Sequence, residues 1–301
     1  MAITRDMGDL TEILRGDFRQ PGPTALRILV GAQLRQLREA RGISREKAGY
    51  TIRASHSKIS RMECGRCSFK LRDVADLLIL YDVADDAERS ALLTLAEQAN
   101  APGWWQDYRD VIPDWFDTYL GLEQDAALIR THEIQFVPGL LQTEDYARAV
   151  ISQGLRGEPA EQIERRVEVR MRRQRILAAP TPRKLWAVLD EAALRRPIGG
   201  AAVMRDQLRR LGELAESPHI TLQVMPFSAE GTVGGVGPIT VLRFAQAELD
   251  DVVYLEHFAG AQYLTKPSEV SPYQQLMNEF IVQAPPPAAT REILRQAMAA
   301  L

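Results

Sequence analysis

The chain has 301 residues with 46% hydrophobic content, which predicts about two domains because single hydrophobic cores stop growing near ~250–300 residues. Its two cysteines exclude a disulfide framework and favour a cytoplasmic location. We expect no secretory signal and no membrane partner, because the N-terminus is charged throughout and no apolar run reaches the ~18 residues of a membrane span.

The net charge of −3 is the sum of two unlike regions. Residues 25–72 contain twelve lysines and arginines and three glutamates, so their net charge is +9 and the rest of the chain carries −12. A solvated surface mixes both signs. Positive charge gathered in one segment of an acidic protein is typical of a site for a polyanion.

A polar arm at residues 1–23 precedes the first predicted helix. Thr24 is placed to cap this helix, which runs from residue 25 to about Arg41 and ends at Gly42. Its apolar residues recur every three or four positions, which is typical of a helix that packs one face on a core.

Four more helices are predicted before residue 100. Ser44 and Ser55 are placed to cap the second and third helices, which a break at 51–54 separates. Gly65 ends the third helix. The fourth and fifth helices, at 71–81 and 87–100, complete an all-α domain of five helices that spans residues 24–100.

The second and third helices have the features of a helix-turn-helix. Two helices that cross steeply need a small residue where they touch, and Gly49 supplies it. Apolar residues that could dock both helices on the bundle are Ala48, Ile52, Ala54, Ile59 and Met62.

The outer face of the third helix is rich in hydrogen-bond donors and acceptors, which suits base edges in a major groove ~12 Å wide. We predict that the residues that read DNA bases are Arg45, His56, Ser57, Ser60 and Arg61. We predict that the residues that bind DNA phosphates are Lys47, Arg53, Lys58, Arg66 and Lys70. The competing interpretation is a helical bundle with a solvated basic face.

The stretches LRQLREARGISREKAG and SHSKISRMECGR resemble the Cro/repressor-type helix-turn-helix family, also called the XRE family. The resemblance covers about residues 25–96. This family usually has Gln where Arg45 stands and Gly where Arg53 stands, so the chain departs from its pattern at two positions. The resemblance also implies a structural ion pair between Arg38 and Glu63.

Both cysteines lie in one Cys-x-x-Cys motif, at Cys64 and Cys67. A redox pair favours a first thiol at a helix N-terminus, whereas Cys64 ends a helix. A structural zinc site needs four ligands, and the sequence has neither a second cysteine pair nor a His-x₃₋₅-His motif. We therefore predict an incidental placement of the cysteines, no metal and no cofactor. The remaining histidines, 132, 219 and 257, are expected to be ordinary sheet residues.

A boundary is predicted at Ala101–Gly103, and an aromatic cluster follows it. Residues 101–284 mix strands with helices and predict a larger α+β domain with a mixed sheet. Strands are expected at 128–137, 184–190, 219–226, 238–244 and 251–258. Helices are expected at 143–154, 159–178, 200–216 and 268–282, with a C-terminal helix at 285–301.

This larger part contains no strong catalytic motif. The glycine-rich stretch at 231–237 joins two expected strands without a following helix to hold a phosphate, which favours a hairpin loop. Asp190 and Glu191 follow a strand and favour a helix start. The helix at 161–177 carries six arginines, and its own glutamates favour a surface helix with internal ion pairs over a face that docks an acidic partner.

Several stretches of the larger part carry a second resemblance: GWWQDYRDVIPDWF, FVPGLLQTEDYARAV, LWAVLDEAALRRPIGG, ITLQVMPFSAEG and DVVYLEHFAG. They resemble the C-terminal domain of actinobacterial XRE regulators that are labelled Scr1-like, antitoxin-like transcriptional regulators. The resemblance implies a domain for partner binding, oligomerisation or ligand sensing, with a small partner protein.

Together these features predict a cytoplasmic, sequence-specific transcriptional regulator that binds double-stranded DNA as a homodimer and is not an enzyme. The alternative is an antitoxin-like interaction protein that sequesters a small acidic partner protein, with DNA binding secondary. A third interpretation is an enzyme that uses the aromatic cluster as a substrate pocket, although such clusters more often form a core or an interface.

Overall fold

The computed structural model describes residues 22–229, 237–246, 249–257 and 259–301. The chain forms two compact units, Met1–Gln106 and Asp107–Leu301. The polar arm predicted at residues 1–23 lies outside the described residues, apart from its last two positions.

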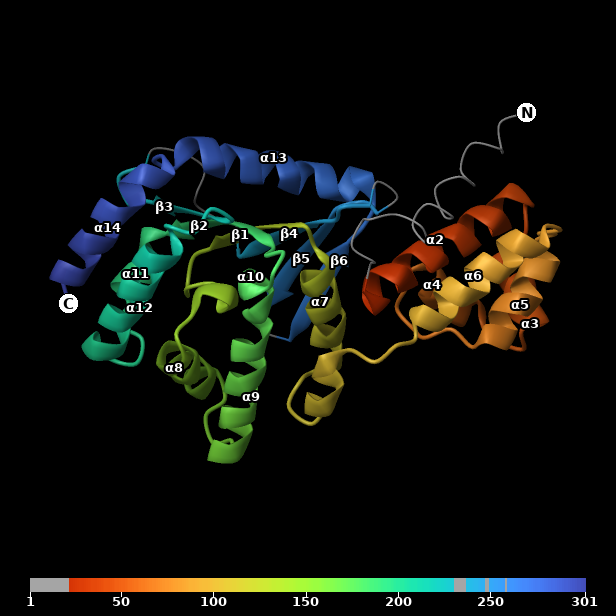
Figure 1. Ribbon diagram of the computed structural model, residues 1–301, viewed down its shortest axis with the longest axis horizontal. Coiled ribbons are helices and arrows are strands. Elements are labelled where there is room, and N and C mark those ends of the chain that lie inside the picture. The colour runs from red at the N-terminus through yellow and green to blue at the C-terminus, as the bar shows by residue number, and fades with distance from the viewer. Residues whose placement is uncertain (1–21, 230–236, 247–248, 258) are drawn as a thin grey trace. The chain divides into compact units, whose positions relative to one another are not determined.

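The five helices predicted for the N-terminal unit are confirmed (Figure 1). They are α2 (Pro23–Ala40), α3 (Arg45–Thr51), α4 (His56–Glu63), α5 (Leu71–Leu80) and α6 (Asp86–Gln98), and the short 3₁₀-helix η1 (Trp104–Tyr108) follows them. Ser44 and Ser55 cap α3 and α4 as predicted, since their hydroxyls accept hydrogen bonds from the backbone N–H of Lys47 and Lys58. Capping of α2 by Thr24 is wrong: Gly22 is the N-cap, because Pro23 has a fixed φ and begins the helix earlier.

Two glycines set how closely the helices of this unit approach one another. Gly31 of α2 lies against α4, where a Cβ at this position would lie 2.4 Å from the carbonyl oxygen of Met62. Gly49 of α3 lies against the turn before α4, where a Cβ would lie 2.6 Å from the carbonyl oxygen of Ala54. This close contact leaves the apolar side chains of α4 almost fully buried.

Gly31→Ala tests this close approach. We expect the substitution to lower the free energy of unfolding by about 1–3 kcal/mol, because the backbone of α4 must move to make room for the methyl group. Chemical denaturation measures the change. Gly212→Ala is the control, because a Cβ there meets open space and the helix should gain about 0.5–1 kcal/mol. Equal effects of the two substitutions would contradict the packing role of Gly31.

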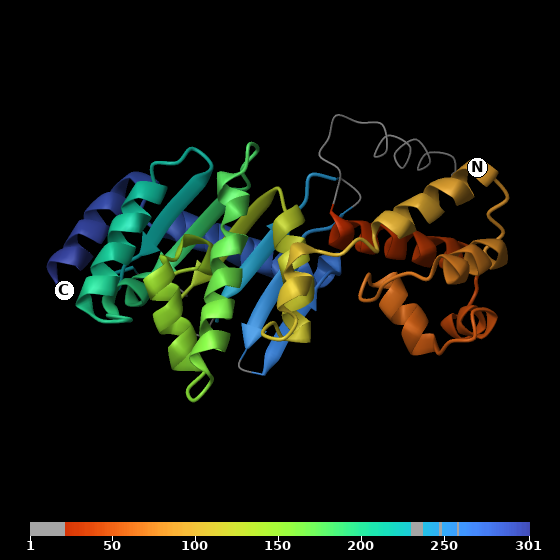
Figure 2. The same ribbon diagram turned by 60° about the horizontal axis from the view of Figure 1, so that its bottom comes forward.

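The C-terminal unit is built on a mixed sheet, as predicted, with six strands where five were expected (Figure 2). Its strands are β1 (Leu128–Glu133), β2 (Lys184–Asp190), β3 (Ile220–Met225), β4 (Ile239–Arg243), β5 (Val252–His257) and β6 (Gly260–Leu264). Their order across the sheet is β3-β2-β1-β4-β5-β6. The first three are parallel, and β4, β5 and β6 continue the sheet from β1 in antiparallel pairs.

Helices lie on both sides of this sheet (Figure 1). α13 (Pro267–Gln283) crosses one face, where Val270, Met277 and Phe280 join the core with residues of β2, β4 and β5. On the other side lie α7 (Asp114–Asp125), α8 (Glu144–Gly154), α9 (Ala160–Arg173), α10 (Arg175–Ala178) and α12 (Ala201–Leu214). The remaining short helices are η2 (Gly139–Leu141) and α11 (Glu191–Arg195).

The C-terminal helix predicted after residue 285 is α14 (Pro287–Ala299). It lies beside the edge strand β3, where the Thr290 hydroxyl donates a 2.7 Å hydrogen bond to the carbonyl oxygen of Leu222. The predicted helix start at Asp190 is also confirmed, because its carboxylate accepts a 2.8 Å hydrogen bond from the backbone N–H of Ala192.

Three predictions for this unit are wrong in detail. The strand expected at 128–137 ends at Glu133, since its neighbour β4 begins at Ile239 after a proline that lacks an N–H for the ladder. The helix expected at 159–178 breaks at Gln174, where its N–H bonds to the nearer carbonyl of Met171. β3 and β4 do not form a hairpin, because β2 and β1 lie between them; residues 231–236 of the expected loop lie outside the described residues.

His132 of β1 is a fully buried sheet residue. Its Nδ1 lies 3.2 Å from the carbonyl oxygen of Val188, and its ring packs on Phe280 with the ring centroids 4.3 Å apart. Burial lowers the pKa of the imidazole below its ordinary value, although the Val188 carbonyl and Asp190 act in the opposite direction. The folded state therefore holds His132 neutral where an unfolded chain would take up a proton.

This burial makes the stability of the C-terminal unit sensitive to acid. The unfolded state binds a proton at a pH near 6.5 that the folded state does not bind, so the free energy of unfolding should fall as the pH decreases below about 6.5. We expect His132→Gln to make this dependence shallower in denaturation experiments at several pH values. His257→Gln, at an exposed position, is the control. An unchanged slope in the His132 variant would contradict the assignment.

Candidate nucleic-acid interface

The helix α4 has two unlike faces. Ile59 and Met62, each 1% exposed, point into the core. On the other side His56, Ser57 and Arg61 are exposed and Ser60 is partly exposed. The polar face predicted from the sequence therefore reaches solvent, with side chains that can donate and accept hydrogen bonds.

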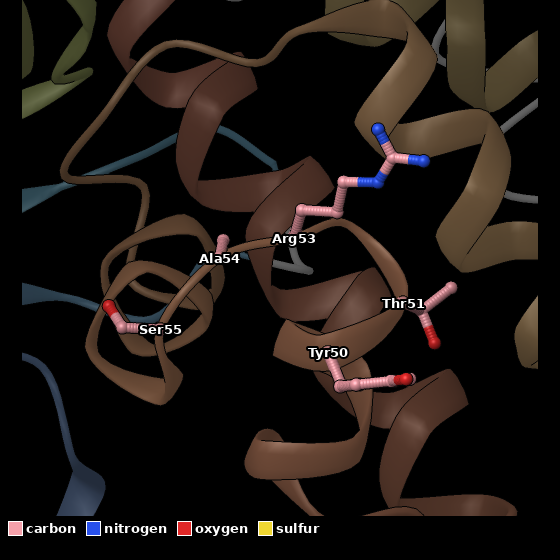
Figure 3. A pocket seen from close by; sticks show the side chains of 5 residues that line it. All are labelled: Tyr50, Thr51, Arg53, Ala54 and Ser55. Atoms are coloured by element: carbon pink, nitrogen blue, oxygen red, sulfur yellow. The ribbon is translucent and has the colours of Figure 1, made fainter.

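The turn between α3 and α4 adopts an uncommon backbone conformation. Arg53 has a φ of 55°, in the left-handed region that favours glycine. Hydrogen bonds from the N–H of Arg53 to Tyr50 (3.1 Å) and from the N–H of Ala54 to Gly49 (2.8 Å) hold the turn. Figure 3 shows the Arg53 side chain extending from this turn. The geometry places a cation where the helix-turn-helix resemblance implies a glycine.

An open hollow of about 660 Å³ adjoins the turn, and its lining residues are Tyr50, Thr51, Arg53, Ala54 and Ser55 (Figure 3). Tyr50 is 85% exposed and was not among the predicted site residues. The sequence marks Tyr50 only as an aromatic residue next to Gly49.

Five of the predicted contact residues are exposed cations that form no ion pair within the described ranges: Lys47, Arg53, Arg61, Arg66 and Lys70. Among the residues that the structure describes, no carboxylate oxygen lies within 4.0 Å of their nitrogen atoms. Exposed positive charges without a carboxylate partner remain available to attract a polyanion.

The other two predicted cations, Arg45 and Lys58, are held by carboxylates of the same unit. Nζ of Lys58 lies 2.5 Å from Oδ2 of Asp73 in the first turn of α5. Nε of Arg45 lies 3.0 Å from Oε2 of Glu63. Neither ion pair was predicted from the sequence; the first joins α4 to α5, and the second joins α3 to α4.

Glu63 is the centre of a buried ionic cluster at the end of α4. Its side chain is 2% exposed and accepts hydrogen bonds from Nε and a terminal nitrogen of Arg38 at 2.5 and 3.1 Å, in addition to the bond from Arg45. The hydrogen bond to Glu63 raises the pKa of Arg38. The ion pair implied by the family resemblance is thus present, and it extends to a third residue.

The cluster leaves one edge of Arg45 available. Its Nε is bound to Glu63, while its two terminal nitrogens donate no hydrogen bond to any part of the chain that the structure describes. A guanidinium held in this way presents a fixed pair of N–H groups, which is the geometry that binds a phosphate or a guanine edge.

The Cys-x-x-Cys motif lies at the C-terminal end of α4. Both cysteines are free thiols, with Cys64 exposed at the C-cap of α4 and Cys67 partly buried. Burial raises the pKa of the Cys67 thiol, which lowers its reactivity near neutral pH. Within the described ranges no group of three or more His, Cys, Asp or Glu side chains is placed to hold a metal ion.

The arginines of α9 bind other parts of the C-terminal unit. The partners expected within the helix are wrong for two of its three glutamates: Glu164 pairs with Arg148 of α8 at 2.6 Å, and Glu168 accepts a hydrogen bond from Tyr108. Arg165 instead pairs with Asp110 at 2.8 Å, and Arg173 pairs with Glu123 of α7 at 2.8 Å. Helix spacing predicted local pairs, but tertiary neighbours compete successfully for these side chains.

Two family models match the chain. A model described as a helix-turn-helix domain matches residues 29–92, and a model described as a domain of unknown function, DUF5753, matches residues 116–296. No curated protein and no solved structure matches the chain. None of the described helices is long and apolar enough to cross a membrane.

The first match and the geometry of α3 and α4 define a helix-turn-helix protein, a class that points to a DNA-binding regulator rather than to an enzyme. The second match spans more than half of the chain, and the chain belongs to the DUF5753 family.

A double-mutant cycle tests the link between Glu63 and Arg45. We expect Glu63→Gln and Arg45→Ala each to weaken binding of duplex DNA, and the double variant to show a coupling of about 0.5–3 kcal/mol, because Glu63 holds the guanidinium of Arg45, a predicted base-reading residue. Titrations with one duplex measure the four affinities.

Glu39→Gln is the control in this cycle, because the exposed Glu39 pairs with Arg35 and Arg38 and does not contact Arg45. The free energy of unfolding of each variant is measured in parallel, since Glu63→Gln also loosens Arg38. Strictly additive losses of affinity would show that Glu63 does not position Arg45.

Proposed function

We propose that the protein is a cytoplasmic, sequence-specific transcriptional regulator of the Cro/repressor type that binds double-stranded DNA through α4. The observation that carries the proposal is the exposed polar face of α4, which includes Arg61, together with four further exposed cations of the same unit; none of the five has a carboxylate partner among the described residues. This combination suits a groove whose floor offers donors and acceptors and whose walls are phosphates.

We assign two kinds of contact to the interface. The base-reading residues are Arg45, His56, Ser57, Ser60 and Arg61. The phosphate-binding residues are Lys47, Arg53, Lys58, Arg66 and Lys70. Within the second set Lys58 has a different role, because its ammonium group already neutralises Asp73 and contributes less net charge to a phosphate contact.

The proposed regulator acts as a homodimer on an inverted repeat. Two copies would present their α4 helices to successive major grooves, with half-sites ~34 Å apart. The DUF5753 domain would mediate dimerisation and binding of a partner or an effector, as the resemblance to Scr1-like, antitoxin-like regulators implies. The family description itself assigns no function to this domain.

DNA binding of selected variants tests the proposal. Arg61→Ala should weaken specific binding by about 1–3 kcal/mol and relax the preference at one base pair, because a base contact is lost. Lys47→Ala should weaken all sequences alike and reduce the slope of log affinity against log salt by about 1, because a phosphate contact is lost. Footprinting and titrations at several salt concentrations measure both effects.

Arg209→Ala is the matched control, since it removes one exposed positive charge from α12 of the C-terminal unit. It should leave both affinity and slope unchanged. Affinity of the unmodified protein that does not depend on salt would contradict phosphate binding. Negligible DNA affinity together with a copurifying small acidic protein would favour an antitoxin-like interaction protein instead.

A further inference from the structure

Two carboxylates of the C-terminal unit lie in one cross-strand row at the ends of β1 and β5. His132 pairs with Ile239 and Thr240 pairs with Tyr254, so the next register positions place Glu133, Pro238 and Glu256 side by side. Directly opposed residues share a face of the sheet, and neighbouring strands are about 4.8 Å apart. The backbones of the two glutamates are therefore about 10 Å apart, with a proline that offers no N–H between them.

Arg173 of α9 and Glu123 of α7 form a bidentate ion pair on this side of the sheet. Two hydrogen bonds of 2.8 Å join the guanidinium to the carboxylate, and both side chains are almost fully buried. The Arg173 guanidinium also lies over the rings of Phe116 and Tyr119, and the Tyr119 ring contacts that of Tyr254 on the sheet at 4.2 Å between centroids. Glu123 and the two rings therefore already balance the charge of Arg173.

Arg170, one turn earlier on α9, is not compensated in this way. It is half-buried and donates one hydrogen bond, of 2.9 Å, to the side-chain oxygen of Gln142. No carboxylate of the described residues lies within 4.0 Å of it. Burial, followed by the proximity of Arg173, lowers the pKa of Arg170 to about 10. A guanidinium so placed lacks the bidentate anion that usually satisfies buried arginine.

Glu133 is the acidic counterpart of Arg170 in this arrangement. It is half-buried, and within the described part of the chain its carboxyl group has no hydrogen bond or ion pair. Burial and the nearby Glu256 raise the pKa of Glu133 to about 8, against the attraction of Arg170 and Arg173. Glu256 is exposed, and the Tyr254 hydroxyl donates a 2.9 Å hydrogen bond to it, so the row opens to solvent.

From this arrangement we infer that the C-terminal unit binds a small zwitterion of the α-amino-acid class between α9 and the ends of β1 and β5. The ligand carboxylate accepts two hydrogen bonds from the Arg170 fork, and its ammonium group donates to Glu133 and Glu256. Each ligand charge supplies the partner that one protein group lacks, and the ammonium removes the repulsion between the two carboxylates. The proposal specifies the effector role given above to this domain, but ligand binding itself requires no DNA.

Such a complex has a proton linkage. The ammonium group needs Glu133 ionised, so binding near neutral pH releases a proton and affinity rises with pH until about 8. The charged and titratable groups around Glu133 are Glu256 of β5, Arg170 and Arg173 of α9, Tyr119 of α7 and Tyr146 of α8. The tyrosine pKa values are raised by burial, so neither tyrosine titrates in this range.

Calorimetric titration of the full chain tests the inference. The probes are the twenty amino acids at millimolar concentration, with methylamine and acetate as probes that carry one of the two charges. We expect saturable binding of at least one amino acid, one molecule per chain, and at least about tenfold weaker binding of both single-charge probes. No binding by any of the twenty would overturn the site, and equal binding of acetate or methylamine would overturn the zwitterion.

Two substitutions locate the site. Glu133→Gln and Arg170→Gln should each weaken binding at least about tenfold. Glu133→Gln nearly preserves shape and removes an unfavourable charge, so its melting temperature should not fall and lost binding cannot be ascribed to unfolding. Glu213→Gln and Arg210→Gln, in an exposed pair on α12, are the matched controls. Affinities of the Glu133 and Arg170 variants equal to the controls would overturn the assignment. DNA affinity, measured separately, decides the regulator proposal.

Discussion

The arrangement of the N-terminal unit depends on one buried carboxylate. Glu63 at the end of α4 would be costly to bury alone, because desolvation of an ion outweighs a single contact. Hydrogen bonds from Arg38 of α2 and Arg45 of α3 offset this cost and fix three helices at one point. Gly31 permits the same contact sterically, since any larger residue there would meet the backbone of Met62 and Glu63. Charge and shape therefore specify one orientation of α4.

The C-terminal unit shows how differently two arginines of one helix can be used. Arg173 and Glu123 form a complete pair between aromatic rings, which favours a single rigid packing of α9 on α7. Arg170 lies three residues earlier and bonds to Gln142, and in the described part of the chain no carboxylate lies within 4.0 Å of it. A neutral side chain of similar volume would stabilise such a position better. The charge of Arg170 is therefore consistent with the amino-acid site proposed above.

Local signals in the sequence were sufficient for the N-terminal unit. Ser44 and Ser55 cap their helices, and Gly65 ends α4 with a φ of 63°, because each of these roles depends on neighbouring residues alone. The exposed face of α4 also followed from helical periodicity. The predicted site lacked Asp73, fifteen residues from its partner Lys58, because no local pattern records such a contact.

Only the fold class of the C-terminal unit could be predicted from the sequence. A mixed sheet followed from the alternation of strands and helices, but the order of its strands did not, because β3 and β4 are consecutive in the chain and two strands apart in space. Neither α7 nor β6 was expected. α7 is rich in aromatic residues that pack through tertiary contacts, and β6 is a short edge strand whose pairing with β5 gives it its conformation. The strand order and these two elements depend on contacts between residues far apart in the sequence, which hydrophobic periodicity does not record.

Arg53 also affects how the turn between α3 and α4 could change. A left-handed backbone costs a residue with a Cβ about 1–2 kcal/mol, which a glycine would not incur. Replacement by glycine would thus relax the turn while removing a charge that faces solvent. At this position glycine would favour the stability of the fold, whereas arginine favours electrostatic attraction. A substitution that stabilises the turn would therefore make the surface less basic.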